Sequence, residues 1–224
     1  MTSHGCRLDE LDVTLPAMNR FLALDEWITP ARSCRGAVLR IRPLRPDDRE
    51  REIALINALS ARSRYFRLFT PLKFLSRHLL DQLMDIDYRQ RMAFVATTQQ
   101  GGAEQFVGVA RYGETAEPGI AELGVSVADA WQRSGIASLL IQQLIRYAQA
   151  QHLRRLVGSV LPDNLAMIAL ARRLAFTVRY DPGQHLFQIS RDLGTPDRPL
   201  QEQARCTGDP LRGNAAALRG SPHT

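Results

Sequence analysis

Residues 125–138 read Val-Ser-Val-Ala-Asp-Ala-Trp-Gln-Arg-Ser-Gly-Ile-Ala-Ser and join a strand pattern to a helix pattern. Upstream, Ile120 to Val127 alternates apolar side chains with polar or small ones, which is the period of a strand. Downstream, Gly135 to Ala150 places apolar residues at spacings of three and four, as in a helix packed on a sheet. Gly135 and Ala137 keep the junction small, so its peptide amides are free to face an anion such as a pyrophosphate.

The sequence on both sides extends this unit into an α/β domain of the α+β kind. Strands are predicted over 37–44, 91–98, 105–112, 120–127, 154–160, 176–180 and 184–190, and helices over 46–59, 135–150 and 164–174. Two short helices are predicted between Ser63 and Asp87, broken at Pro71, with Ser76 as the cap of the second. A turn at Gly101-Gly102 predicts a hairpin.

The chain divides into three regions by composition. Residues 1–36 show no sustained periodicity and are expected to be an N-terminal extension, partly disordered. Residues 37–193 are expected to form the domain. Residues 194–224 carry few large apolar side chains, so they cannot offset the entropy of ordering and are expected to be a disordered tail.

The overall composition excludes several classes of protein. Hydrophobic residues make up 45% of the 224 and charged residues 23%, which is typical of a globular chain. No apolar run reaches the roughly 18 residues of a membrane span, and the first 18 residues lack the pattern of a signal peptide. We therefore expect a cytoplasmic protein without a membrane partner. The 29 basic and 23 acidic residues give a net charge of +6, but the arginines are scattered and do not favour nucleic acid as a partner.

The cysteines and histidines predict neither a metal site nor a hydrolytic triad. The three cysteines are far apart and odd in number, and the five histidines lack the spacing of metal ligands. None of the histidines lies beside a candidate nucleophile in a recognisable arrangement. We therefore expect no metal cofactor.

The motif Gln132-x-x-Gly135-x-Ala137 resembles the acyl-CoA signature of the GNAT acetyltransferase superfamily, Gln/Arg-x-x-Gly-x-Gly/Ala. The resemblance covers about residues 37–190 and includes the element order, Asn164, and Ala175-Phe176 where the family commonly has Gly-Phe. More narrowly, five segments look like the catalytic domain of bacterial protein lysine acetyltransferases of the Pat type: Ser63-Arg-Tyr-Phe-Arg-Leu-Phe69, Asp85-Ile-Asp-Tyr88, Met92-Ala-Phe-Val-Ala96, Ala121-Glu-Leu-Gly-Val125 and Leu170-Ala-Arg-Arg-Leu-Ala-Phe176.

This resemblance implies both a fold and a reaction. The GNAT fold is a mixed, mostly antiparallel sheet of about seven strands, splayed between the fourth and fifth and flanked by about four helices. The implied reaction moves the acetyl group of acetyl-CoA directly to a primary amine, with a protein lysine side chain as the preferred acceptor. Two alternatives stay open, a small-molecule amine N-acetyltransferase and a non-catalytic CoA-binding regulatory module. The expected partner is thus a protein substrate, and the expected assembly is a monomer or homodimer.

The resemblance also assigns the catalytic and donor-binding residues. Glu122 is the expected general base, since strand alternation and the family motif put its carboxylate beside the donor; the alternative is a salt bridge to Arg91 or Arg111. The Val125 amide is expected to face the thioester carbonyl, and Asn164 either orients the pantetheine arm or only caps a helix. The residues expected to contact acetyl-CoA are Val125, Val127, Gln132, Arg133, Ser134, Gly135, Ile136, Ala137, Ser138 and Asn164.

On the acceptor side, Tyr65 and Arg67 are the expected substrate-binding residues. Arg67 would attract acidic groups on a protein substrate, or else belongs to a solvated basic helix face. Many GNAT enzymes place a tyrosine acid seven residues after the motif asparagine, but this sequence has Ala171 there. The general acid is therefore unassigned, and Tyr65, Tyr112 and Tyr147 are candidates by residue type alone.

Overall fold

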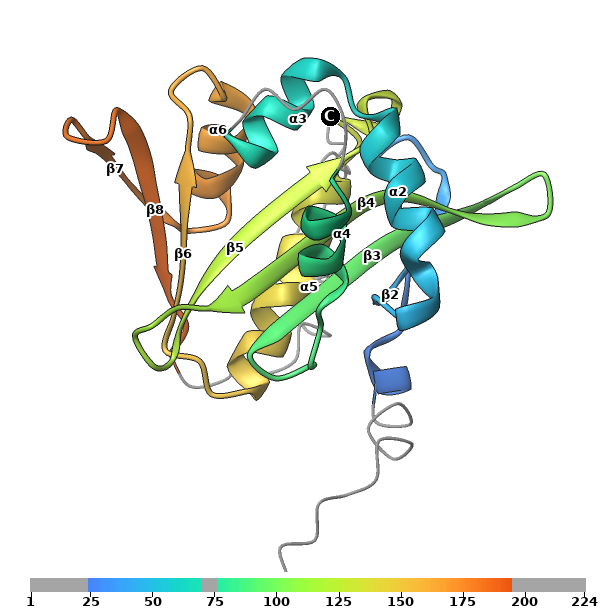
Figure 1. Cartoon of the computed structure of the whole chain (residues 1–224), viewed down its shortest axis with the longest axis horizontal. Coiled ribbons are helices and arrows are strands. Elements are labelled where there is room, and N and C mark those ends of the chain that lie inside the picture. Colours follow the sequence, from blue (N-terminus) through green and yellow to red (C-terminus); the bar gives the residue numbers. More distant parts are fainter. Residues whose placement is uncertain (1–23, 70–75, 195–224) are drawn as a thin grey trace, which may run out of the picture.

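A mixed sheet of eight strands forms the centre of the part of the chain that the structure, a computed structural model, describes, residues 24–69 and 76–194 (Figure 1). The strand order is β1-β2-β3-β4-β5-β6-β8-β7, and every neighbouring pair is antiparallel except β5 and β6. The strands are β1 (Thr29–Arg32), β2 (Val38–Pro43), β3 (Arg91–Gln100), β4 (Ala103–Glu114), β5 (Ile120–Val127), β6 (Arg155–Val160), β7 (Thr177–Asp181) and β8 (Leu186–Asp192). The mixed, mostly antiparallel sheet predicted from the sequence is confirmed.

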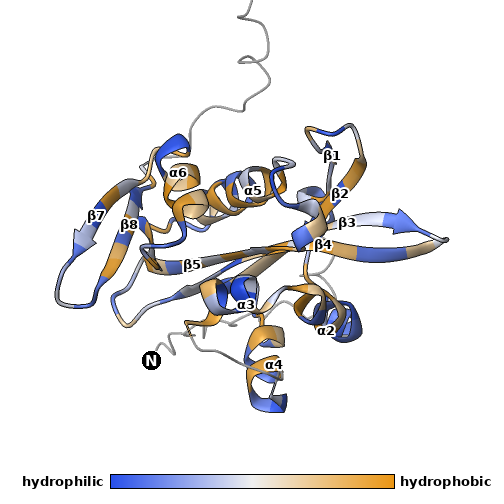
Figure 2. Ribbon diagram, turned by 90° about the horizontal axis from the view of Figure 1, so that it is seen from above, coloured by the Kyte–Doolittle hydropathy of each residue, from blue (hydrophilic) through white to orange (hydrophobic). Residues whose placement is uncertain are grey.

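Helices cover both faces of the sheet (Figure 2). One face carries α2 (Arg49–Ala58), α3 (Ala61–Leu68) and α4 (Arg77–Met84), and the other carries α5 (Ile136–Ala150) and α6 (Leu165–Arg173). Ser76 caps α4 as predicted, with its hydroxyl 3.1 Å from the Leu79 amide. Pro71, the expected break before it, lies outside the described residues. None of the described helices combines the length and apolarity needed to cross a membrane.

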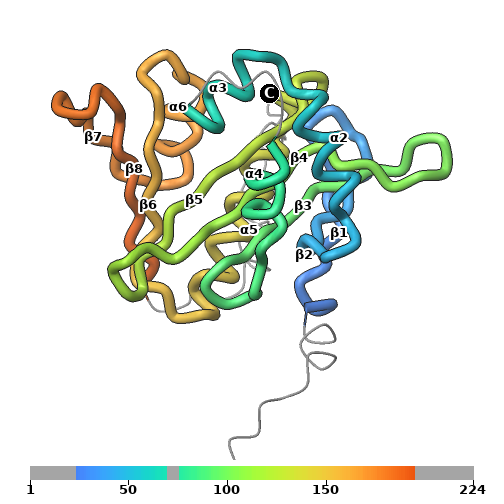
Figure 3. Tube along the Cα trace, viewed as in Figure 1, coloured from blue at the N-terminus to red at the C-terminus, as the bar shows by residue number. Residues whose placement is uncertain are grey.

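The described residues hold eight strands and five α-helices, where about seven and about four were expected. The additional strand, β1, comes from the segment expected to be an extension, and it pairs with β2 from Thr29↔Ile41 to Arg32↔Val38 (Figure 3). The sequence pattern did not predict β1, because this strand spans only four residues and contains Pro30, a residue that fits only an edge strand. Residues 1–23 and 195–224 lie outside the described part.

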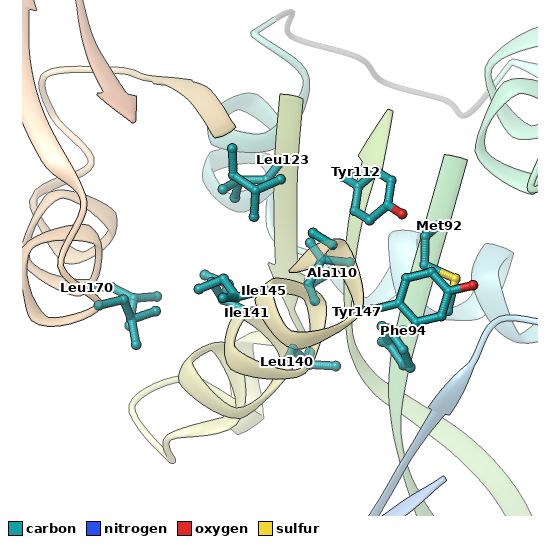
Figure 4. Close-up of a cluster of buried hydrophobic side chains, with 14 of the residues drawn as sticks. Met92, Phe94, Ala110, Tyr112, Leu123, Leu140, Ile141, Ile145, Tyr147 and Leu170 are labelled. Atoms are coloured by element: carbon teal, nitrogen blue, oxygen red, sulfur yellow. The ribbon is translucent and has the colours of Figure 1, made fainter. Parts of the chain in front are cut away.

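The main core lies between α5 and the sheet (Figure 4). Leu140 and Leu144 of α5 are fully buried there, against Phe94 and Ala110 of the central strands. A smaller cluster on the other face of β3 packs Ala93 and Val95 under α2. Because both faces of β3 are covered, its sequence is apolar over consecutive positions.

A buried ion network fixes the start of α2 to the sheet. Arg42 of β2 is only 2% exposed and donates two hydrogen bonds to Asp48, at 2.6 and 2.8 Å. The same guanidinium donates to Glu104 of β4 at 2.8 and 3.1 Å. The hydrogen bond from Arg42 lowers the pKa of the Glu104 carboxyl to about 2.

The parallel contact between β5 and β6 is short. It includes three residue pairs and ends at Glu122↔Val157, although both strands continue beyond it. From Leu123 onward the two strands diverge, as the resemblance implied for the fourth and fifth predicted strands (Figure 1). This divergence opens the sheet at the end where the β5–α5 loop begins.

Candidate active site

A cavity of about 1310 Å³ passes through the opening between β5 and β6. On one side it is bounded by α3 and by the end of β4, and on the other by β6 and α6. The segment 122–127 of β5 runs along it, and the loop leading into α5 closes one end. The cavity therefore brings the predicted donor loop and the predicted acceptor side into one continuous space.

The loop before α5 presents a row of free peptide amides. The six N–H groups of residues 133–138 have no acceptor among the described residues, since the first hydrogen bond of the helix runs from the Leu139 amide to the Gly135 carbonyl. Arg133 and Gly135 adopt positive φ angles of 57° and 83°, which fold the chain into a tight concave turn. Together with the helix N-terminus, this turn can hold a pyrophosphate.

Two of the predicted donor contacts in this loop have side chains that do not face the cavity, and Ser134 lies outside the cavity lining altogether. The Ser134 side chain is 1% exposed, and its hydroxyl donates to the Trp131 carbonyl instead of facing the cavity. The Ile136 side chain is also 1% exposed and belongs to the core. Gly135, Ala137 and Ser138 line the cavity, and their contact with acetyl-CoA stays a prediction.

The Gln132 side chain connects the loop to α3. Its amide nitrogen donates to the Ser63 hydroxyl at 3.1 Å and to Asp129 at 3.3 Å. The other oxygen of Asp129 accepts from the Ser60 amide at 2.8 Å, at the N-cap of α3. Partial burial opposes ionisation, but the hydrogen bonds from Ser60 and Ser63 lower the pKa of Asp129 below its ordinary value. Sequence reasoning missed this network, because Asp129 and Ser60 are 69 residues apart.

Glu122 stands on the cavity wall at the point where β5 and β6 separate. It is exposed, and no hydrogen bond or ion pair to its carboxylate exists within the described ranges. The alternative salt bridges are absent there, since Arg111 pairs with Glu52 and Arg91 pairs with acidic residues after α4. The carboxylate is therefore free to take a proton from a molecule in the cavity.

Arg67 reaches from α3 to β5, where it lines the same cavity as Glu122. Its guanidinium packs on the backbone of Gly124, where an added Cβ would be 2.7 Å from Cζ. Burial and the neighbouring Arg111 lower the pKa of Arg67 to about 10, so it is still a cation at neutral pH. Arg111 is neutralised by the buried Glu52, whereas Arg67 has no hydrogen-bond or ion-pair partner in the described part of the chain.

The other predicted site residues divide between the cavity and its surroundings. Val125 and Val127 are half-buried and line the cavity. Asn164 also lines it, while its side-chain oxygen accepts from the Met167 amide at 3.2 Å and caps α6. Tyr65 is 39% exposed on α3 and does not line the cavity.

Among the described residues, Tyr112 lines the cavity, but its hydroxyl is already engaged as a hydrogen-bond donor. Ala171 is buried on α6 and carries no hydroxyl. The Tyr112 hydroxyl donates to the Arg89 carbonyl at 3.0 Å, and the Tyr147 hydroxyl donates to the Tyr88 carbonyl at 2.6 Å. Burial raises the pKa of both phenols, that of Tyr147 to about 12. Both are structural hydrogen-bond donors.

Comparisons with known proteins agree with this architecture. The family described as the acetyltransferase (GNAT) domain matches residues 39–177. A Pseudomonas aeruginosa protein named acetyltransferase PA5475 is 40% identical over 167 residues, which cover 75% of this chain and 89% of that protein. The acetyltransferase Pat of Mycolicibacterium smegmatis is 32% identical over 156 residues, 69% of this chain but only 46% of Pat.

Solved structures give the same result. The GNAT domain of Pat from S. lividans superposes with a TM-score of 0.68 at 28% identity, covering 75% of this chain and 98% of that domain. The cAMP-binding acyltransferase from Mycobacterium smegmatis gives a TM-score of 0.53 at 26% identity, covering 84% of this chain and 57% of that one. A family match over more than half of the chain and a relative at 40% identity lead to one conclusion. This chain belongs to the GNAT family of acetyltransferases.

Proposed function

We propose that this GNAT acetyltransferase moves the acetyl group of acetyl-CoA to the side-chain amine of a protein lysine. The observation that carries the proposal is the free carboxylate of Glu122 at the point where β5 and β6 part, with the loop amides of Arg133 and residues 135–138 at the end of the same cavity. The likeness to two Pat proteins supports lysine as the acceptor. We expect the reaction to take place in the cytoplasm, in a monomer or homodimer.

The donor is held mainly by backbone groups. The amides of Arg133 and of residues 135–138 bind the pyrophosphate, and Arg133 adds a positive charge at the same turn. Beyond Glu122 the peptide groups of β5 that face β6 are open to the pantetheine arm along Val125 and Val127. The Val125 amide is assigned to the thioester carbonyl as an oxyanion donor, and Asn164 to the pantetheine from the α6 side.

Glu122 removes a proton from the acceptor ammonium, directly or through a water molecule. A free lysine ammonium has a pKa of about 10.4, so this step is needed near neutral pH. The neutral amine then attacks the thioester carbon and the C–N bond forms. The C–S bond breaks as CoA leaves as the thiolate, and the second proton lost from the nitrogen passes to the thiolate or to solvent. A thiol of pKa near 8.5 can leave without an acid, which fits the alanine at position 171.

Arg67 binds an acidic side chain that lies near the acceptor lysine of the substrate. Arg67 is a half-buried residue whose guanidinium has no hydrogen-bond or ion-pair partner among the described residues, and a carboxylate can bind guanidinium donors in pairs. Because Arg67 and Glu122 face the same cavity, the acceptor would present an amine to one and a carboxylate to the other. Tyr65 stays a prediction, as an outer contact for a large acceptor.

Acetyl transfer from labelled acetyl-CoA to lysine peptides, to polyamines and to free amino acids tests the proposal. We expect transfer to peptides in which an acidic residue neighbours the lysine, with a clear preference over matched peptides carrying glutamine instead. Transfer only to small amines would favour the small-molecule alternative. Binding of CoA without turnover on any acceptor would instead indicate a regulatory module.

A further inference from the structure

We infer that the turn Ser33–Gly36 positions the loop that binds the acyl donor. Arg35 is the residue of the turn that makes most of the hydrogen bonds to this loop. The turn joins β1 to β2 and packs on the outside of the loop that precedes α5. Its hydrogen bonds go to carbonyl oxygens of that loop, whereas Arg133 and residues 135–138 of the loop line the cavity. The inference rests on the proposed donor site, and it adds residues that lie before residue 39, where the family match begins.

Three hydrogen bonds connect the turn to the loop. The Cys34 amide donates to the Ser134 carbonyl at 2.8 Å. The Arg35 guanidinium donates to the Gln132 carbonyl at 3.1 Å and to the Ala130 carbonyl at 3.3 Å. One arginine thus bridges two carbonyls of the loop, an arrangement that needs a forked side chain.

Holding a carbonyl fixes the direction of the next amide. In a trans peptide the C=O and the following N–H point in opposite directions, and no cis peptide occurs in the described residues. The bonds to the Gln132 and Ser134 carbonyls therefore turn the N–H groups of Arg133 and Gly135 the other way. Both belong to the row of free amides assigned to the pyrophosphate. Arg35 and Cys34 thus orient the N–H groups of Arg133 and Gly135 toward the donor without binding the donor themselves.

The turn is itself held in place. The Ser33 amide donates to the Ala37 carbonyl at 3.0 Å, and the Ser33 hydroxyl accepts from the Ala37 amide at 3.1 Å. Further upstream, the Trp27 ring packs edge-on against Tyr147 with centroids 4.8 Å apart. The Gln143 side chain donates to the Trp27 carbonyl at 3.1 Å. Segment 27–34 therefore follows α5 in the reverse direction and is anchored at both ends.

Close packing of Cys34 on Gly135 is a second observation that the turn and the loop fit tightly together. A Cβ at this position would be 2.7 Å from the Cys34 sulfur, besides requiring a strained φ of 83°. Position 135 therefore requires glycine because a side chain there would collide with Cys34, in addition to any requirement on the side of the donor. The loop is held between the β1–β2 turn and the cavity.

The experiment compares acetyl-CoA with acetyl-pantetheine, which lacks the pyrophosphate, in wild type and Arg35→Gln. We expect the KM for acetyl-CoA and the Kd for CoA by calorimetry to rise about 5–20-fold, with kcat at saturating acetyl-CoA within about twofold. The kcat/KM for acetyl-pantetheine should not change. Arg35→Lys should recover part of the affinity, because an ammonium can still bond one carbonyl. Arg40→Gln, which removes another exposed arginine charge, on β2, is the matched control.

Two outcomes would overturn the inference. One is an unchanged CoA affinity in a folded Arg35→Gln protein, judged by its thermal unfolding midpoint. The other is an equal loss with both donors, which would indicate a general disturbance of the domain. If wild type binds CoA but acetylates no acceptor, the proposed function fails, while the calorimetric comparison of the variants still decides the role of Arg35.

Discussion

The guanidinium of Arg67 lies against the backbone of Gly124, in space that any larger residue at position 124 would fill. Gly124→Ala should displace this guanidinium without unfolding the protein, since the obstructing atoms are the far end of a flexible side chain. We expect kcat/KM for an acidic lysine peptide to fall about tenfold, while the affinity for CoA stays constant. Peptide kinetics with calorimetry of CoA checks this, and a parallel loss of CoA affinity would contradict it.

Glu122→Gln should separate donor binding from turnover. The amide keeps the shape of the side chain but cannot accept the proton, so turnover should fall by about 10²–10⁴-fold at unchanged CoA affinity. The acidic limb of the pH–rate profile should flatten or move upward, because the amine must then lose its proton in solution. Glu117→Gln, which alters only an exposed pair with Arg154, is the matched control. Near-normal turnover in Glu122→Gln would assign the base to another group.

Gly135→Ala should weaken donor binding even though a methyl group carries no charge. Its Cβ would approach the Cys34 sulfur to 2.7 Å at a φ of 83°, so the loop has to move. We expect the Kd for CoA to rise at least tenfold, and Gly135→Glu should raise it further by adding negative charge near the pyrophosphate. Calorimetry of the folded variants measures both, and an unchanged Kd in Gly135→Glu would place the donor elsewhere.

Asp129→Asn should affect the donor and the acceptor together. Asp129 holds the N-cap of α3 and the Gln132 side chain, so its loss loosens the contact between the donor loop and the helix that carries Arg67. We expect the KM values for acetyl-CoA and for a lysine peptide each to rise about 3–10-fold. A change confined to one substrate would mean that the network does not connect the two sides.

The Arg42–Glu104 ion pair makes the free energy of unfolding decrease as the pH falls into the acid range. The pKa of Glu104 is lowered from 4.5 to about 2 on folding, so its contribution is complete above pH 4.5 and disappears as the pH falls toward 2. Glu104→Gln should therefore cost about 2 kcal/mol at neutral pH and reduce the pH dependence of unfolding between those limits. Urea unfolding at pH 7 and pH 3 tests this. Equal losses at both pH values would show that packing, and not charge, is responsible.

The sequence was most informative where the signal is local. The alternation over Ile120–Val127 predicted β5 at its observed bounds, and the motif around Gly135 located the turn with free amides. Contacts between distant segments were not predictable, because periodicity carries no information about them. The packing of Arg67 on Gly124 and the bonds from Arg35 to the loop are of this kind. The outward position of Tyr65 depends likewise on how α3 is rotated against the sheet.

The early end of the β5–β6 pairing affects which substitutions this enzyme can accept during evolution. A donor recognised through the peptide groups of β5 is insensitive to the side chains of that strand. Leu123 packs in the core on one face of β5, while Glu122 and Gly124 on the opposite face line the cavity on its proposed acceptor side. On the proposed assignment, we therefore expect substitutions on α3 and on that face to alter acceptor selectivity while acetyl-CoA binding is kept.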